Sequence, residues 1–262
     1  MLLLIAVVPR ISGPGGGAPA VDSAASPAGT PGARPTGVGP RPDEPSAQRE
    51  LPDRPAASPD VAARRPGARY PLDPRLRLGG DFATVPGEDA APGTGKRYTY
   101  RVEIEQGLAL DGPLFAETVQ RTLNDPRSWS HDGLTFARTD AGTVNFVVRL
   151  ASPGTLHRIC SPIVGDTSVA NVSCNASGTP WVMINAWRWA QGSTAYDEGE
   201  DVLDYRRMLI DHEVGHRLGH QHETRCGPGG LAPVMMQQTK SREAADGTLC
   251  TANPWPYPKA TE

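Results

Sequence analysis

Four of the chain's six histidines fall within eleven positions, and their spacing constrains the fold more than any other feature. His212 and His216 are four residues apart, so on an α-helix their imidazole rings lie on one face, about one turn apart. Gly219 follows them, and glycine readily takes the left-handed conformation that ends a helix. His222 comes three residues later, where a chain that turns back can supply a third ring. The stretch therefore predicts a helix that ends at Gly219, beside a cluster of three histidines.

Three neutral imidazole nitrogens are a typical ligand set of a catalytic Zn²⁺ site, because the fourth tetrahedral position stays open for water. Glu213 is adjacent to the first histidine, where its carboxylate can reach that water without binding the metal. We therefore predict His212, His216 and His222 as zinc ligands and assign Glu213 as general base. A closed structural zinc site has no use for such a base, so the pattern favours peptide hydrolysis.

Two other residues are alternatives for the third ligand. His220 lies four residues after His216 and would replace His222 if the helix continued through Gly219. The glycine favours a turn at that point, which makes His222 the better choice. A downstream carboxylate such as Glu243 is the other alternative, and it would make His222 dispensable for zinc.

The chain has four cysteines with no Cys-x-x-Cys spacing, which fits disulfides in an oxidising compartment better than a thiolate zinc site. Pairing by proximity joins Cys160 to Cys174 and Cys226 to Cys250, one of three possible pairings. The 26 basic and 29 acidic residues form no long block of one sign. Charge therefore indicates neither nucleic acid nor an anionic membrane surface as a partner.

The chain is expected to have three parts. Residues 1–10, MLLLIAVVPR, are too short to span a bilayer and look like the remnant of a signal peptide or membrane anchor. Residues 11–95 are rich in Pro, Gly and Ala without sustained periodicity, which predicts a disordered spacer. Residues 96–262 are expected to form one domain. The protein would then be extracellular, or tethered to a membrane or cell wall through its N-terminus.

The hydrophobic periodicity of the domain changes between the strand and helix types along the chain, which predicts an α+β fold. The turn-rich segment 153–180, which carries two cysteines, is expected to be a loop. The elements expected in order are a strand (97–108), a helix (113–125), three strands (133–140, 144–152 and 181–190) and a long helix (201–219).

The motif from His212 to His222 matches the metzincin signature HExxHxxGxxH. Metzincins also have a tight turn with a methionine beneath the zinc, and residues 232–238, APVMMQQ, resemble that turn. Met235, which follows an apolar residue, is the methionine that we expect there. The resemblance covers roughly residues 97–258. It implies a metzincin-like domain with a mixed sheet, an active-site helix and an irregular C-terminal part stapled by a disulfide.

More narrowly, the chain is similar to an actinobacterial family of exported, metzincin-like proteins of unknown function. The resemblance implies a bacterial, zinc-dependent endopeptidase but does not identify its substrate. We expect a monomer that acts on a protein or peptide. It also shows a departure, because no tyrosine follows the methionine turn where astacins and serralysins place theirs. Tyr257 is the distant candidate for a tyrosine that assists the transition state.

A second hypothesis belongs to a different functional class. It is a non-catalytic binding module of the cell surface or wall, in which zinc and disulfides only stabilise the C-terminal part. Glu213 distinguishes the two hypotheses, because only an enzyme needs a base beside the metal. Two further questions stay open from sequence. Trp181, Trp187 and Trp189 either line a substrate cleft or pack elsewhere, and Asp211 either hydrogen-bonds near the ligands or is solvated.

Overall fold

The computed structural model describes residues 65–196 and 202–260. The expected leader, residues 1–10, and the expected spacer as far as residue 64 lie outside the described residues. The elements in chain order are β1 (Phe82–Thr84), β2 (Lys96–Glu105), α1 (Gly112–Leu123), the 3₁₀ helix η2 (Trp129–Asp132), β3 (Leu134–Arg138), β4 (Phe146–Ala151), α2 (Pro153–Val164), β5 (Cys174–Asn175), β6 (Trp181–Asn185), α3 (Ala186–Gln191), α4 (Leu203–Leu218) and the 3₁₀ helix η3 (Pro228–Gly230).

The strands form one mixed sheet with the order β1-β2-β4-β6-β5, and β3 pairs with β2 beside this path. β2, β3, β4 and β6 run parallel to one another, whereas β1 and β5 are antiparallel to their neighbours. Val148 in β4 lies opposite Val102 in β2 and Val182 in β6, and all three side chains are fully buried. The predicted α+β class with a mixed sheet is confirmed. The two-residue strand β5 forms one edge of the sheet.

Helix α1 packs its apolar face onto the sheet. The Asp111 side chain accepts a hydrogen bond from the Leu114 N–H (2.9 Å), the usual role of an aspartate at a helix start. Phe115, Val119 and Leu123 follow at intervals of four residues and are fully buried. The ring of Phe115 meets Trp189 of α3 edge to face. The helix predicted for residues 113–125 is therefore present.

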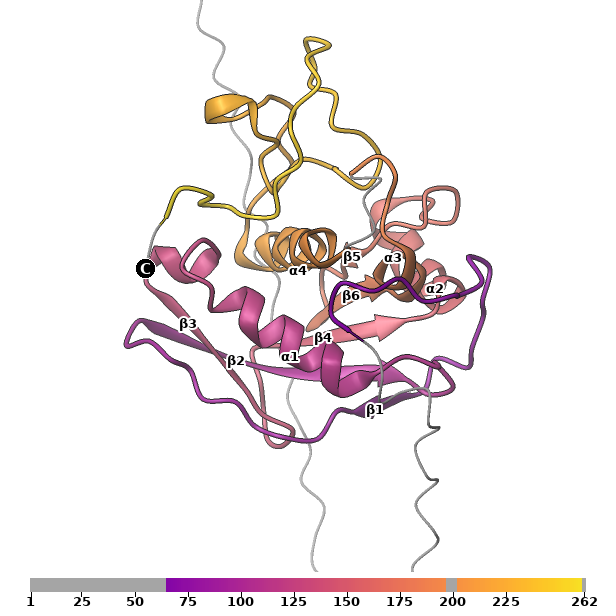
Figure 1. Cartoon of the computed structure of the whole chain (residues 1–262). Coiled ribbons are helices and arrows are strands. Elements are labelled where there is room, and N and C mark those ends of the chain that lie inside the picture. Colours follow the sequence, from indigo (N-terminus) through magenta and orange to yellow (C-terminus); the bar gives the residue numbers. More distant parts are fainter. Residues whose placement is uncertain (1–64, 197–201, 261–262) are drawn as a thin grey trace, which may run out of the picture. The chain divides into compact units, whose positions relative to one another are not determined.

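Helix α4 occupies the centre of the domain. It contacts α1 and strands β5 and β6 on the side of the sheet. Figure 1 shows it between the sheet and the mostly irregular segment that follows it, drawn in orange to yellow. That segment, residues 220–260, contains no helix beyond η3. Within residues 65–196 and 202–260, no helix combines the length and apolar character that a membrane crossing requires.

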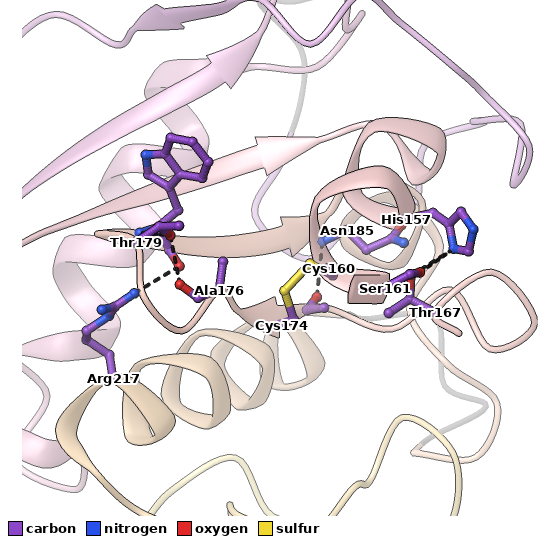
Figure 2. The surroundings of a disulfide bond; sticks show 11 residues. His157, Cys160, Ser161, Thr167, Cys174, Ala176, Thr179, Asn185 and Arg217 are labelled. Carbon is purple, nitrogen blue, oxygen red and sulfur yellow. Dashed lines mark hydrogen bonds between the residues drawn. A yellow bond between two sulfur atoms is a disulfide. The ribbon is translucent and has the colours of Figure 1, made fainter. Parts of the chain in front are cut away.

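Both expected disulfides are confirmed. Cys160 of α2 is bonded to Cys174 of β5, as Figure 2 shows, so the disulfide ties the edge strand to a helix. Cys226 is bonded to Cys250 within the C-terminal part. Two disulfides are typical of proteins from an oxidising compartment.

Removing the second disulfide is expected to lower the free energy of unfolding by about 3 kcal/mol, because the bond closes a loop with a sequence separation of 24. A small cluster formed by Ala232, Met236 and Ala244 packs beside the bond. Urea denaturation of the Cys226→Ser/Cys250→Ser variant under oxidising conditions measures the loss. An unfolding free energy equal to that of the wild type would show that the C-terminal part is held by other contacts.

Residues 153–164 form helix α2, so the prediction of a loop over all of 153–180 was wrong. The Ser152 side chain accepts a hydrogen bond from the Thr155 N–H, and Pro153 fills the first turn. Leu156 and Cys160 then face the core at helical spacing. Ser152 and Pro153 are the sequence signals for the start of this helix. The cysteines and turn residues that follow obscured it.

The strand predicted for residues 181–190 is a strand only as far as Asn185. The Asn185 side chain accepts hydrogen bonds from the N–H groups of Trp187 and Arg188 and so starts the short helix α3. The aromatic residues after it have high strand propensity, but this capping contact and tertiary packing override that preference.

The folded domain begins before the expected boundary at residue 96. Residues 82–84 form β1, and the fully buried Arg206 of α4 donates hydrogen bonds to the carbonyl oxygens of Pro66 and Ala68. Residues 65–95 lack hydrophobic periodicity. They are ordered by hydrogen bonds to residues far along the chain, which a local pattern does not reveal.

Candidate metal centre

The histidines of α4 lie on one face, as their spacing predicts. The ring centroids of His212 and His216 are 4.8 Å apart. The helix ends at Leu218, and Gly219 takes the left-handed conformation with φ +104°. The chain then turns back, and the ring centroid of His222 lies 4.6 Å from that of His216. Three rings from one helix and the turn after it thus meet at one place.

The ring nitrogens of this cluster are spaced as one metal ion requires. One nitrogen from each of His212, His216 and His222 lies within 4.8 Å of the others. The Nε2 atoms of His216 and His222 are 3.1 Å apart. Two nitrogens bound to one tetrahedral Zn²⁺, each at about 2.0–2.1 Å, would be separated by about 3.3 Å. The observed separation is close to that value.

Backbone carbonyls fix the orientation of two of the rings. The Nδ1 of His212 is 2.8 Å from the Val234 carbonyl oxygen, and the Nδ1 of His216 is 2.9 Å from that of His220. A carbonyl oxygen only accepts hydrogen bonds, so each Nδ1 carries the proton and each Nε2 keeps its lone pair. This arrangement is the usual outer support of metal-binding histidines.

The protonation state of the rings also suits a metal. Burial is the main cause that lowers the pKa of His212 to about 3. Burial likewise lowers the pKa values of His216 and His222. The neutral imidazole, which is the form that binds a metal, is therefore favoured at neutral pH.

The alternative third ligands lie elsewhere. The ring of His220 stacks on Trp129, with centroids 4.1 Å apart, and lines a different hollow from the three histidines. Glu243 forms an isolated bridge with Leu249 and is not part of the histidine group. Of the candidates for a third ligand, the structure brings only His222 to the helix histidines.

Glu213 lies in the same cleft as the three histidines. Its side chain is buried, and burial raises the pKa of its carboxyl group to about 8, although a hydrogen bond from the Asn175 N–H opposes this shift. A proton acceptor is most effective when its pKa lies near the working pH. The position and environment of Glu213 therefore suit a general base.

The methionine turn is present and touches the centre. The Met236 N–H donates to the Pro233 carbonyl (2.9 Å), which closes a turn with Val234 and Met235 at its middle. Met235 is buried in the main core, whereas Met236 packs with the C-terminal cluster. The carbonyl of Val234 is the one that orients the His212 ring. The turn thus contacts α4 at His212 through the Val234 carbonyl and at Gly215 through Met235.

Gly215 is the point where this contact is tightest. A Cβ atom at this position would lie 2.5 Å from the Met235 Sδ and 2.7 Å from Trp129 Cζ2. The Gly215→Ala variant is expected to lose up to about 2 kcal/mol of unfolding free energy, because overpacking costs about 1–3 kcal/mol and exceeds the roughly 1 kcal/mol gain in helix propensity. Gly227→Ala is the control, since its added carbon would meet nothing closer than 3.5 Å. A thermal midpoint for Gly215→Ala at or above that of the wild type would contradict this packing.

Asp211 is fully buried rather than solvated. Its Oδ1 accepts a hydrogen bond from the Ser128 hydroxyl (2.7 Å), and its backbone carbonyl accepts one from the indole N–H of Trp129 (2.8 Å). Burial raises the pKa of its carboxyl group well above the usual range. Asp211 therefore anchors α4 to η2 directly before the first histidine.

The cleft in front of the histidines has a volume of about 310 Å³. Residues of α4, among them both helix histidines and Glu213, form one side of it together with Gln221 and His222. The segment between α2 and β5, the edge strand β5 itself and the turn Gln237–Lys240 form the rest. Sequence reasoning missed these walls, because they come from three separate segments that no single pattern joins.

The aromatic residues considered from sequence lie outside this cleft. Trp189 is buried against Phe115, and the guanidinium of Arg149 stacks over Trp181. The Tyr257 hydroxyl donates to Asp132 (2.6 Å) beside the other hollow. Tyr257 is therefore not positioned to act on a substrate at the histidines.

The chain belongs to the family described as "Protein of unknown function (DUF3152)", whose model matches residues 73–258. No curated protein matches the chain. No solved structure matches it either. The matched region begins before residue 96, as the ordered part of the structure does. Because the family description assigns no function, the function has to be argued from the site.

Proposed function

We propose that this member of the DUF3152 family is a zinc-dependent endopeptidase of the metzincin type. One observation carries the proposal. The nitrogens of His212, His216 and His222 converge at one end of a cleft whose wall also holds the buried carboxyl group of Glu213. A metal site with an open position and an adjacent base is the arrangement that hydrolysis requires.

The residues present fit Zn²⁺. Three neutral imidazoles suit this ion, and backbone carbonyls orient two of them with Nε2 free. His212, His216 and His222 would hold the metal. When bound, Zn²⁺ would supply Lewis acidity and positive charge, which lower the pKa of a water and favour the ionised form of a nearby carboxylate.

Glu213 would move the proton in the reaction. Its carboxylate takes a proton from the attacking water as the water oxygen forms a bond to the carbonyl carbon of the substrate. The π electrons of the carbonyl move onto its oxygen. Glu213 then gives the proton to the amide nitrogen as the C–N bond breaks, which leaves a carboxylic acid and an amine.

The arrangement of the fold supports the metzincin assignment. A mixed sheet packs against one side of α4, and the C-terminal part with its methionine turn packs against the other. Met235 lies beneath the histidine cluster at the tight contact with Gly215. The two disulfides support action outside the cytoplasm or at the cell surface. The proposal also takes the protein to be a bacterial monomer that acts on a protein or peptide.

A peptide library tests the proposal. The full-length protein, loaded with zinc, is incubated with a peptide library, and new termini are identified by mass spectrometry. We expect cleavage within the peptides that stops after chelation and returns when zinc is restored. Zinc bound without cleavage of any peptide would contradict the proposal and favour the non-catalytic surface or wall binding module.

A further inference from the structure

Among the described residues, Lys240 is the only lysine or arginine that lines the cleft. It is exposed at the cleft's rim, and none of the ion pairs found within the described ranges involves it. No carboxylate therefore neutralises its ammonium group there. A cation of this kind is available to an anionic group inside the cleft.

The backbone that carries Lys240 is held in place. The Lys240 N–H donates to the Gln237 carbonyl (2.9 Å) and closes a turn. The Thr239 carbonyl accepts a hydrogen bond from the Ser193 hydroxyl (2.8 Å), and the Thr239 hydroxyl lies 3.0 Å from that of Tyr205 in α4. The turn is thereby fixed to the same helix that carries the histidines.

Lys240 lines the same cleft as the three histidines, so its ammonium group and the proposed metal centre would act on one substrate. A second cation beside a cationic metal centre is unfavourable unless an anion lies with them. Hydrolysis of a peptide bond creates such an anion on the carbonyl oxygen.

We propose that Lys240 stabilises the oxyanion that forms on the scissile carbonyl, an inference that rests on the proposed function. As the carbonyl π electrons move onto the oxygen, the ammonium group donates a hydrogen bond to it and keeps its own protons. Among the described residues, no tyrosine lines the cleft. Lys240 would therefore stabilise the transition state in place of a tyrosine.

The test compares Lys240→Met and Lys240→Arg with Lys259→Met, all in the zinc-loaded, full-length protein. Lys259 is exposed and lies at the other hollow, so its variant is a matched control. Zinc content, kcat and KM for a cleaved peptide, and binding of inorganic phosphate by calorimetry are measured. Phosphate is a tetrahedral anion, and its binding can be measured without any catalytic reaction.

We expect Lys240→Met to keep its zinc, to lose about 10²- to 10³-fold in kcat with KM little changed, and to bind phosphate about tenfold more weakly. Lys240→Arg should keep part of the kcat and part of the phosphate affinity, because arginine keeps the positive charge. The control should resemble the wild type in every measurement.

Wild-type kcat and wild-type phosphate affinity in Lys240→Met would overturn the role of Lys240 while leaving the peptidase intact. If the wild-type protein cleaves no peptide at all, the proposed function fails instead. Phosphate binding alone then decides whether Lys240 is part of an anion site: weaker binding in Lys240→Met supports it, and unchanged binding refutes it.

Discussion

Glu213→Gln is expected to lower kcat by about 10²- to 10⁴-fold while the protein keeps its zinc. Glutamine has nearly the shape of glutamate, so the cleft and the three histidines should stay in place. It has no carboxylate to take the proton from water, so the chemical step should slow and KM should change little. Steady-state kinetics on a peptide found in the library measures the effect, with zinc content determined on the same samples.

Glu243→Gln is the matched control, because Glu243 is exposed and lies outside the histidine group. We expect it to retain both zinc and activity, which would also exclude this residue as a ligand. If Glu213→Gln were as active as the control, Glu213 would not be the base, and its burial beside the histidines would need another explanation.

His222→Ala is expected to weaken zinc binding by at least about 100-fold and to abolish cleavage. Loss of an outer partner of a metal ligand already costs about 10–100-fold, so loss of the ligand itself should cost at least that much. His220→Ala should bind zinc like the wild type, since its ring stacks on Trp129 away from the cluster. Competition with a coloured chelator gives the two affinities.

His220 and His222 are only two residues apart, and the turn at Gly219 determines which of them reaches the helix histidines. The two variants therefore distinguish the alternatives for the third ligand. Loss of zinc in His220→Ala with zinc retained in His222→Ala would mean that the helix continues through Gly219. The assignment of the third ligand would then be wrong.

The histidine cluster could be predicted from the sequence because its geometry is local. Helical spacing sets the relation of His212 to His216, and one glycine determines the turn that brings His222 back. The two disulfides could also be predicted, since each joins the cysteines nearest to each other along the chain.

The surroundings of the cluster could not be predicted, because they depend on contacts between distant segments. The hydrogen bond from Ser128 to Asp211 joins residues 83 positions apart. The Val234 carbonyl that orients His212 comes from a turn 22 residues away. Nothing in the local pattern of either segment specifies these pairs.

The ordered backbone before residue 96 also depends on contacts with distant residues. The backbone near Pro66 and Ala68 is ordered by the side chain of Arg206, about 140 residues later. A segment rich in proline and glycine resembles a disordered spacer until the partner that binds it is known.

Anomalous diffraction at the zinc edge, from crystals of the full-length protein grown with zinc, tests the central claim most directly. We predict one peak bonded to Nε2 of His212, His216 and His222, with a water in the fourth position facing Glu213. A peak bonded to His220 or Glu243 instead, a fourth protein ligand that closes the site, or no peak at the cluster would contradict the account of an open, three-histidine hydrolytic centre.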